Sequence, residues 1–474
     1  MTSPAASESI NRQPLLWLVA LGFFMQTLDS TIVNTALPAM AHSLGESPLR
    51  MQSVVVVYSL TMAMLIPASG WLADRFGTQR VFFSAILCFV IGSLCCAGSH
   101  TLTQLVASRV LQGAGGAMLL PVGRLAVLRS VPPKRFLEAM SFVAVPGLVG
   151  PLIGPTLGGW LVVATSWHWI FLINVPIGAI GCIATFFYMR NEKGPDRSPF
   201  DYAGYLMLSI GMVAISVALD GLSGFGIKHA SMFVLLIFGL ASLVAYWLHA
   251  AQSAHPLFAT SLFKVPTFSI GLLGNLFARL GSGSIPFLIP LTLQVGLGHT
   301  PVQAGVMMLP ISISALITKR VVTPLILHFG YKRVLTINTL FVGLSVASFA
   351  FIAPSQPAWI RVIQLVIFGF FNSLQFTAMN TVVLKDLTPA QASSGNTLLS
   401  MVQMLAMGFG VAVAGTLINI FTDLDARERA SALEAFHSTF VCVGLITCAS
   451  AWIFAQLSKD VRRGNEKEPA ELSS

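Results

Sequence analysis

Charged residues are scarce in this 474-residue chain: Asp, Glu, Lys and Arg together make up 9% of it, whereas hydrophobic residues make up 55%. A soluble domain has about 25% charged residues, which it needs to cover its surface. The composition therefore excludes a cytosolic enzyme, a secreted domain and a disordered regulator. It predicts a polytopic membrane protein.

Motifs for catalysis or cofactor binding are also missing. The six Cys residues lie in apolar runs, no two of the nine His residues have His-x-x-x-His spacing, and there is no Gly-Lys-Ser/Thr phosphate loop. We therefore expect no enzyme activity, no metal site, no cofactor and no ATP coupling. The cysteines are interpreted as reduced packing residues.

Long apolar runs are abundant, and a helix needs about 20 such residues to cross a bilayer. Open backbone groups find no partner in lipid, so these runs should be helices. The sequence predicts an all-α protein with 14 transmembrane helices near residues 14–36, 52–73, 80–98, 103–126, 138–163, 168–189, 202–220, 230–249, 267–295, 302–325, 333–353, 359–383, 394–421 and 437–457.

The net charge of +9 comes from 27 Lys and Arg residues against 18 Asp and Glu. These basic residues favour one set of loops over the opposite set by about four to one, as expected for cytoplasmic loops. An even number of spans places both termini on that side. The charge thus reflects membrane topology, and we expect no nucleic-acid partner.

Two basic hairpins, residues 70–80 and 323–333, resemble each other when Gly77 is aligned with Gly330, which pairs Arg80 with Arg333. Each joins the second and third spans of a six-span block, a mark of repeats in transporters. The predicted segments are a cytoplasmic N-terminus (1–13), a six-helix bundle (14–190), two additional helices (191–265), a pseudo-symmetric six-helix bundle (266–457) and a cytoplasmic tail (458–474).

Five segments together resemble the major facilitator superfamily, and in particular its fourteen-helix branch of drug:proton antiporters. They are residues 28–38, 70–80, 109–115, 150–159 and 167–178. The resemblance implies a multi-pass protein of the bacterial inner membrane, a monomer, that exports small molecules in exchange for protons. It also implies alternating access and drug-like amphiphiles as substrates.

Asp29 and Arg109 lie deep within the first and fourth predicted spans, where an ionised group is costly unless it faces water or a partner. Both are candidates for proton coupling, and the resemblance implies that role for Arg109. Two structural interpretations stay open: Asp29 as a carboxylate bonded to neighbouring groups, and Arg109 as a link to the backbone of another helix.

Arg279, in the ninth span, is a candidate cation of a substrate cavity, or alternatively one half of a buried structural pair. The other cavity candidates are polar residues in the spans, which usually face protein or water: Asn34, Gln112, Asn275, Asn372, Gln375 and Asn380. The predicted spans contain two deep Arg residues and one deep Asp. This balance of charges suits an anionic substrate at least as well as a drug-like amphiphile. The alternative function is therefore export of an anionic metabolite, such as an organic acid or its metal chelate.

Asp74 ends the second span at its cytoplasmic side, where the helix dipole disfavours an anion. We expect a partner for it, namely Arg75, Arg80 or the start of the thirteenth span near residues 393–395. The resemblance implies a cytoplasmic gate formed by Gly70, Asp74, Arg75, Gly77 and Arg80. The alternative is that these charges only set topology.

Gly150, Gly154 and Gly158 recur every four residues in the fifth span and form one flat stripe for close helix contact. Pro151 and Pro155 remove backbone donors beside this stripe. Together with Gly159, these residues resemble the antiporter motif of the family, which implies close and bendable packing.

Overall fold

The computed structural model describes residues 13–132, 135–194, 199–221, 228–428 and 432–458. In these ranges every regular element is a helix, which agrees with the predicted all-α class. The predicted terminal segments 1–13 and 458–474 lie almost entirely outside the described residues.

The helices follow one another along the chain with short connections. Residues 13–188 form α2 (Gln13–Leu44), η1 (Pro48–Met51), α3 (Gln52–Phe76), α4 (Thr78–Ala97), α5 (Leu102–Ser130), α6 (Phe136–Ala164), α7 (Trp169–Leu172) and α8 (Asn174–Tyr188). Two further helices follow, α9 (Tyr202–Gly221) and α10 (Lys228–Gln252). The remainder forms η3 (Thr260–Lys264), α11 (Pro266–Ser282), α12 (Ile285–Leu291), η4 (Thr292–Gly296), α13 (Pro301–Met307), α14 (Leu309–Ser348), η5 (Phe349–Phe351), α15 (Ala358–Leu384), α16 (Pro389–Glu428) and α17 (Ala432–Phe454).

Thirteen helical stretches in the described residues are long and apolar enough to cross a membrane. The predicted spans 302–325 and 333–353 fall together in one stretch of 51 residues, Pro301–Phe351. That stretch contains a break, because Gly330 has a φ of 76° inside α14. Since one crossing needs about 20 residues, its length is ample for two.

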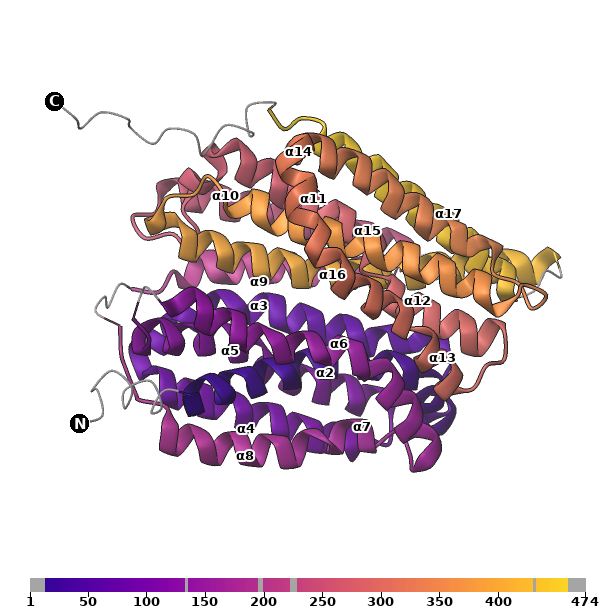
Figure 1. The fold of residues 1–474 in the computed structure, drawn as a ribbon, viewed down its shortest axis with the longest axis horizontal. Helices are drawn as coiled ribbons and strands as arrows, with labels where there is room; N and C mark the ends of the chain where they lie inside the picture. Colours follow the sequence, from indigo (N-terminus) through magenta and orange to yellow (C-terminus); the bar gives the residue numbers. More distant parts are fainter. Residues whose placement is uncertain (1–12, 133–134, 195–198, 222–227, 429–431, 459–474) are drawn as a thin grey trace.

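The helices run roughly alongside one another (Figure 1). α2 to α8 lie together in the lower part of the view and most of α11 to α17 lie in the upper part, while α13 reaches down beside α6 at the right. α9 lies between the two groups, in contact with α3 on one side and α16 on the other.

Asp201 connects α9 and α10 at one end of this helix pair. Its carboxylate accepts hydrogen bonds from the backbone N–H of Gly204 (2.9 Å) and of Leu257 (3.1 Å), and it lies 2.8 Å from Nε2 of His249. Burial alone would raise the pKa of Asp201, but these hydrogen bonds lower it overall. The contacts join the start of α9, the end of α10 and the loop that leads to η3.

The glycines of α6 allow this helix to touch α2 without intervening side chains. A Cβ atom at Gly150 would lie 2.5 Å from Oγ1 of Thr27, one at Gly154 would lie 2.3 Å from Oγ1 of Thr31, and one at Gly158 would lie 2.5 Å from the carbonyl oxygen of Ile32. The stripe therefore faces α2, and any larger residue would force the two helices apart.

An adjacent face of α6 meets the C-terminal group of helices. A Cβ atom at Gly159 would lie 2.2 Å from the carbonyl oxygen of Pro301, and one at Gly305 would lie 2.3 Å from that of Pro155. Oγ1 of Thr156 donates to the carbonyl of Gly305 at 3.2 Å. The antiporter-like segment thus packs on both groups of helices at once.

Replacing Gly158 by Ala should destabilise the protein by about 1–3 kcal/mol, because the new methyl group would meet backbone atoms of α2 that cannot rotate away. Thermal unfolding of the purified protein in detergent measures this. Gly70→Ala is the matched control, since a Cβ atom there meets nothing within 4 Å. Equal unfolding temperatures for the two variants would contradict the packing described above.

Candidate functional site

A buried ion pair joins α2 to α5. Nη1 of Arg109 lies 2.6 Å from Oδ2 of Asp29, and the side chains are 1% and 0% exposed. The two deep charges predicted from the sequence are therefore direct partners. Their burial makes removal of either charge costly, because the remaining charge would have no counter-ion.

Three neutral side chains complete the surroundings of Asp29. Nε2 of Gln112 donates to Oδ1 of Asp29 at 2.7 Å, and its Oε1 accepts from Nη1 of Arg109 at 2.6 Å. Nε2 of Gln112 also donates to Oγ of Ser93 at 2.8 Å, and Nδ2 of Asn174 lies 3.3 Å from Oδ1 of Asp29. All five side chains are buried. Both carboxylate oxygens of Asp29 therefore have hydrogen-bond donors, whereas Oδ1 of Asn174 is buried without a partner.

Arg109 has further contacts on the side away from Asp29. Its Nε donates to the carbonyl of Val54 at 3.3 Å, and its guanidinium lies 4.0 Å from the centre of the Tyr58 ring. Both residues are on α3. Arg109 therefore makes the expected hydrogen bond to the backbone of another helix, and in addition it forms the ion pair with Asp29.

Small residues bring these helices close enough for the network to form. A Cβ atom at Gly92 would lie 2.5 Å from the backbone nitrogen of Gln112, so α4 and α5 are in backbone contact beside Ser93. Gly113 similarly faces the carbonyl of Tyr58, at 3.0 Å from its hypothetical Cβ. The glycine-rich segment after Arg109 thus determines how closely α3 and α4 approach it.

Arg279 has a different environment on α11. Its Nε donates to Oδ1 of Asn275 at 2.9 Å, and its guanidinium lies 4.5 Å from the centre of the Phe376 ring. Within the described residues no acid pairs with it, and Nη2 of Arg279 and Nδ2 of Asn275 are buried donors without a partner. Two unsatisfied donors at one place are costly unless a ligand or water accepts from them.

The other predicted cavity residues belong to separate hydrogen-bond groups. Gln375 is buried between Asn338 (2.7 Å) and Thr339 (2.6 Å). Asn380 accepts from Gln403 at 2.6 Å, and Asn34 donates to the carbonyl of Ser30 at 3.3 Å. Asn372, also on α15, is of intermediate exposure. The structure therefore joins Gln112 to the ion pair and Asn275 to Arg279, but it does not connect the remaining four to either.

Asp74 has a partner other than those expected. It pairs with Arg129 at the end of α5, not with Arg75, Arg80 or the residues near 393–395. The expectation was wrong because it considered only charges in the same hairpin and one distant helix, whereas α3 and α5 pack side by side and end together. Arg75 instead lies over the ring of Trp71, at 5.5 Å.

Residues 190–194 contact the hairpin that holds the gate candidates, and sequence reasoning missed them. The backbone N–H of Thr78 donates to the carbonyl of Glu192 at 3.0 Å, and that carbonyl also accepts from Arg129 at 3.0 Å. Arg80 donates through its backbone to Oδ1 of Asn191 at 3.4 Å. Gly77 has a φ of 96°, and a Cβ atom there would lie 2.0 Å from the same Oδ1.

Arg129→Gln should weaken this contact and leave Asp74 without its cation. We expect residues 190–194 to become more accessible, with a faster reaction of a cysteine introduced at Glu192 towards a water-soluble maleimide. Arg124→Gln, a nearby cation on α5 with no part in the Asp74 contact, is the control. An unchanged labelling rate in Arg129→Gln would mean that Arg129 does not hold this segment.

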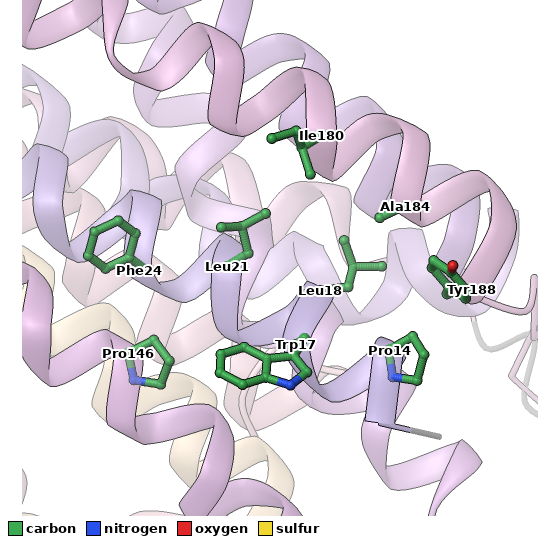
Figure 2. A pocket seen from close by; sticks show the side chains of 9 residues that line it. All are labelled: Pro14, Trp17, Leu18, Leu21, Phe24, Pro146, Ile180, Ala184 and Tyr188. Atoms are coloured by element: carbon green, nitrogen blue, oxygen red, sulfur yellow. The ribbon is translucent and has the colours of Figure 1, made fainter. Parts of the chain in front are cut away.

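An apolar groove lies on the surface of the N-terminal group of helices. Figure 2 shows side chains of α2, α6 and α8 around it, with Trp17, Phe24, Pro146, Ile180 and Tyr188 among them. Its volume is about 420 Å³, and none of its lining residues carries a charge or belongs to the Asp29 network. The groove can accept apolar groups but offers no ionic chemistry.

Comparisons with known proteins agree with this architecture. The Major Facilitator Superfamily model matches residues 19–411 and 271–471. The "Putative multidrug resistance protein MdtD" of Serratia proteamaculans is 50% identical over 457 residues, which cover 96% of each chain. The protein of the same name from Pectobacterium atrosepticum is 49% identical over 461 residues, 97% of this chain and 98% of the relative.

Solved structures with a similar fold are also transporters. A mutant of the nucleoside transporter NupG has a TM-score of 0.68 at 14% identity, over 93% of this chain and 99% of its own. A D-xylose-proton symporter has a TM-score of 0.68 at 12% identity, over 95% and 98%. From the helical fold, the family model and the full-length relatives it follows that this chain is a multi-pass membrane transporter, not an enzyme, and belongs to the Major Facilitator Superfamily.

Proposed function

We propose that this transporter is a proton-coupled antiporter that exports small, drug-like amphiphiles by alternating access. In this proposal it is a monomer of the bacterial inner membrane. It has both termini in the cytoplasm and 14 spans, with α9 and α10 between two six-helix bundles. The observation that carries the proposal is the buried Asp29–Arg109 pair, because it provides a proton acceptor at membrane depth.

The proposed coupling follows from the charges of the pair. Protonation of Asp29 removes the counter-ion of Arg109 and leaves a buried cation, which is unfavourable until the site opens to water or to a substrate. A cationic amphiphile that approaches ionised Asp29 competes with the proton for the same carboxylate. Since the pair is closed to solvent in this structure, the cycle requires another state in which it is exposed.

The amphiphilic character of the substrate has separate support. The relatives of this chain carry the name multidrug resistance protein. The groove of α2, α6 and α8 is apolar and lies on the outer surface of the helices, where Trp17 and Ile180 are exposed. We infer that apolar substrates reach the protein from the lipid phase at such a surface.

Arg279 favours a second candidate, export of an anionic metabolite such as an organic acid or its metal chelate. The unsatisfied donors of Arg279 and Asn275 suit a carboxylate, which would accept from both. The face of Phe376 beside the guanidinium would suit a substrate with a planar group. In this case Arg279 holds the substrate while Asp29 carries the proton.

Everted membrane vesicles test both candidates. With a pH gradient imposed and reported by a fluorescent dye, ethidium should dissipate the gradient if the substrate is a cationic amphiphile, and a dicarboxylic acid should do so if it is an anion. Arg279→Ala should abolish only the second response. A panel of amphiphiles and acids that leaves the gradient unchanged would contradict proton-coupled transport of either class.

A further inference from the structure

A second groove lies on the C-terminal group of helices, between α15 and the parts of α14 on both sides of Gly330. It encloses about 300 Å³ and is lined mainly by apolar side chains, among them Ile337, Phe341, Phe370 and Phe371. The rings of Phe341 and Phe371 are stacked at 4.8 Å. Ile337 and Phe341 are 52% and 45% exposed, so the groove opens on the surface of the helices and not towards their interior.

The polar residue within this groove needs no ligand. Nδ2 of Asn338 donates to the carbonyl of Phe371 at 2.9 Å and to Oε1 of Gln375 at 2.7 Å. Its amide is thus used in holding α14 to α15. What remains available in the groove is an apolar wall.

Arg333 lines one end of the same groove, is exposed, and pairs with no acid in the part of the chain that the structure describes. Lys332 precedes it, and the hairpin 323–333 contains no Asp or Glu. A cation beside an apolar groove, at the end of a membrane-spanning helix, is the arrangement that suits an anionic lipid: the charge binds the headgroup and the groove binds a chain.

The first hairpin shows what the second lacks. There Asp74 supplies an anion that pairs with Arg129 of α5. The aligned position in the second hairpin is Leu327, which is 71% exposed. The second hairpin therefore contains cations but no acid of its own, and in the described residues the nearby acid, Asp386 after α15, is close to Tyr331 and forms no ion pair with Arg333. The charge of Arg333 is thus available to an anion from outside the chain.

We propose that an anionic phospholipid binds here, with its phosphate at Arg333 and an acyl chain along Phe341, Phe370 and Phe371. The lipid comes from the leaflet on the side of the two basic hairpins, the cytoplasmic one in the proposed topology. It supplies to the second hairpin the negative charge that Asp74 supplies to the first. This binding does not depend on the transported substrate or on proton coupling.

Brominated lipids test the proposal, because bromine on an acyl chain quenches nearby Trp fluorescence. The full-length protein with Ile337→Trp is reconstituted in phosphatidylcholine vesicles that contain a small fraction of brominated phosphatidylglycerol or of brominated phosphatidylcholine. Subtraction of the parent protein's signal isolates the new Trp. We expect phosphatidylglycerol to occupy the groove about fivefold more readily than phosphatidylcholine, as one basic residue near the surface predicts.

The groove of α2, α6 and α8 is the internal control, because it has no charged lining residue and already contains Trp17. Subtracting the fluorescence of Trp17→Phe from that of the parent isolates the signal of Trp17. Brominated phosphatidylglycerol and brominated phosphatidylcholine should quench this signal equally. Adding Arg333→Gln to Ile337→Trp should remove the preference at Ile337, and excess soluble glycerol phosphate should not displace the lipid. Equal quenching by both lipids at Ile337, an unchanged preference in Arg333→Gln, or full displacement by glycerol phosphate would each overturn the proposal.

Discussion

Asp29→Asn is expected to abolish substrate-dependent proton movement in everted vesicles. The amide keeps the size of the carboxylate and can still bond to Gln112 and Asn174, but it cannot take up a proton. Transport driven by the pH gradient should fall to the level of vesicles without the protein. Binding of an anionic substrate at Arg279, measured on purified protein, should persist, because Arg279 belongs to a separate group of contacts.

The control for this variant is Gln112→Glu, which adds an acid beside Asp29 without removing the existing one. It should retain proton coupling with a shifted pH dependence, since two neighbouring carboxylates do not ionise independently. Asp29→Asn transporting as the parent does, with the same pH response, would show that the carboxylate is structural and that protons use another group.

Neutralising both Asp29 and Arg109 should distinguish the contribution of the ion pair to stability from its contribution to proton coupling. Asp29→Asn or Arg109→Gln alone leaves one buried charge without its partner, which costs about 3–5 kcal/mol. The double variant Asp29→Asn/Arg109→Gln removes both charges, so it should recover most of that loss. Thermal unfolding of the four proteins in detergent measures the coupling between the two sites.

The double variant also decides between the two interpretations of the pair. If the charges serve only to join α2 and α5, the recovered protein should transport normally. The proposed coupling requires instead that it is stable but inactive. A double variant as unstable as the worse single variant would show that the hydrogen-bond network, and not the charge balance, dominates the stability of this site.

Much of the fold could be predicted from composition alone, because lipid allows few alternatives to long apolar helices. The exception is the stretch Pro301–Phe351, where helical geometry continues through the hairpin and only the φ of Gly330 marks the turn. The depth of Asp29 and Arg109 was also evident, since charges are rare in such runs. That they bond to each other depends on how α2 and α5 are rotated, which a single sequence does not specify.

The missed residues have a common physical reason. Ser93 and Asn174 are neutral, and one polar residue in an apolar helix has many possible roles, so nothing marks them as neighbours of Asp29. Asn174 does fall within the segment 167–178 that resembles the fourteen-helix branch, and that was the one available signal. The contact of Glu192 with Thr78 uses backbone atoms, which carry no sequence signature.

Proton release on substrate binding is the most direct test of the central claim, that substrate and proton compete through the Asp29–Arg109 pair. A substrate identified in the vesicle assay is added to purified protein in weakly buffered detergent solution that contains a pH indicator. The parent protein should release protons in proportion to the substrate bound. Asp29→Asn lacks the carboxylate that a cationic substrate approaches, so it should bind such a substrate more weakly and release no protons at any substrate concentration. Equal proton release from the two proteins would contradict the account.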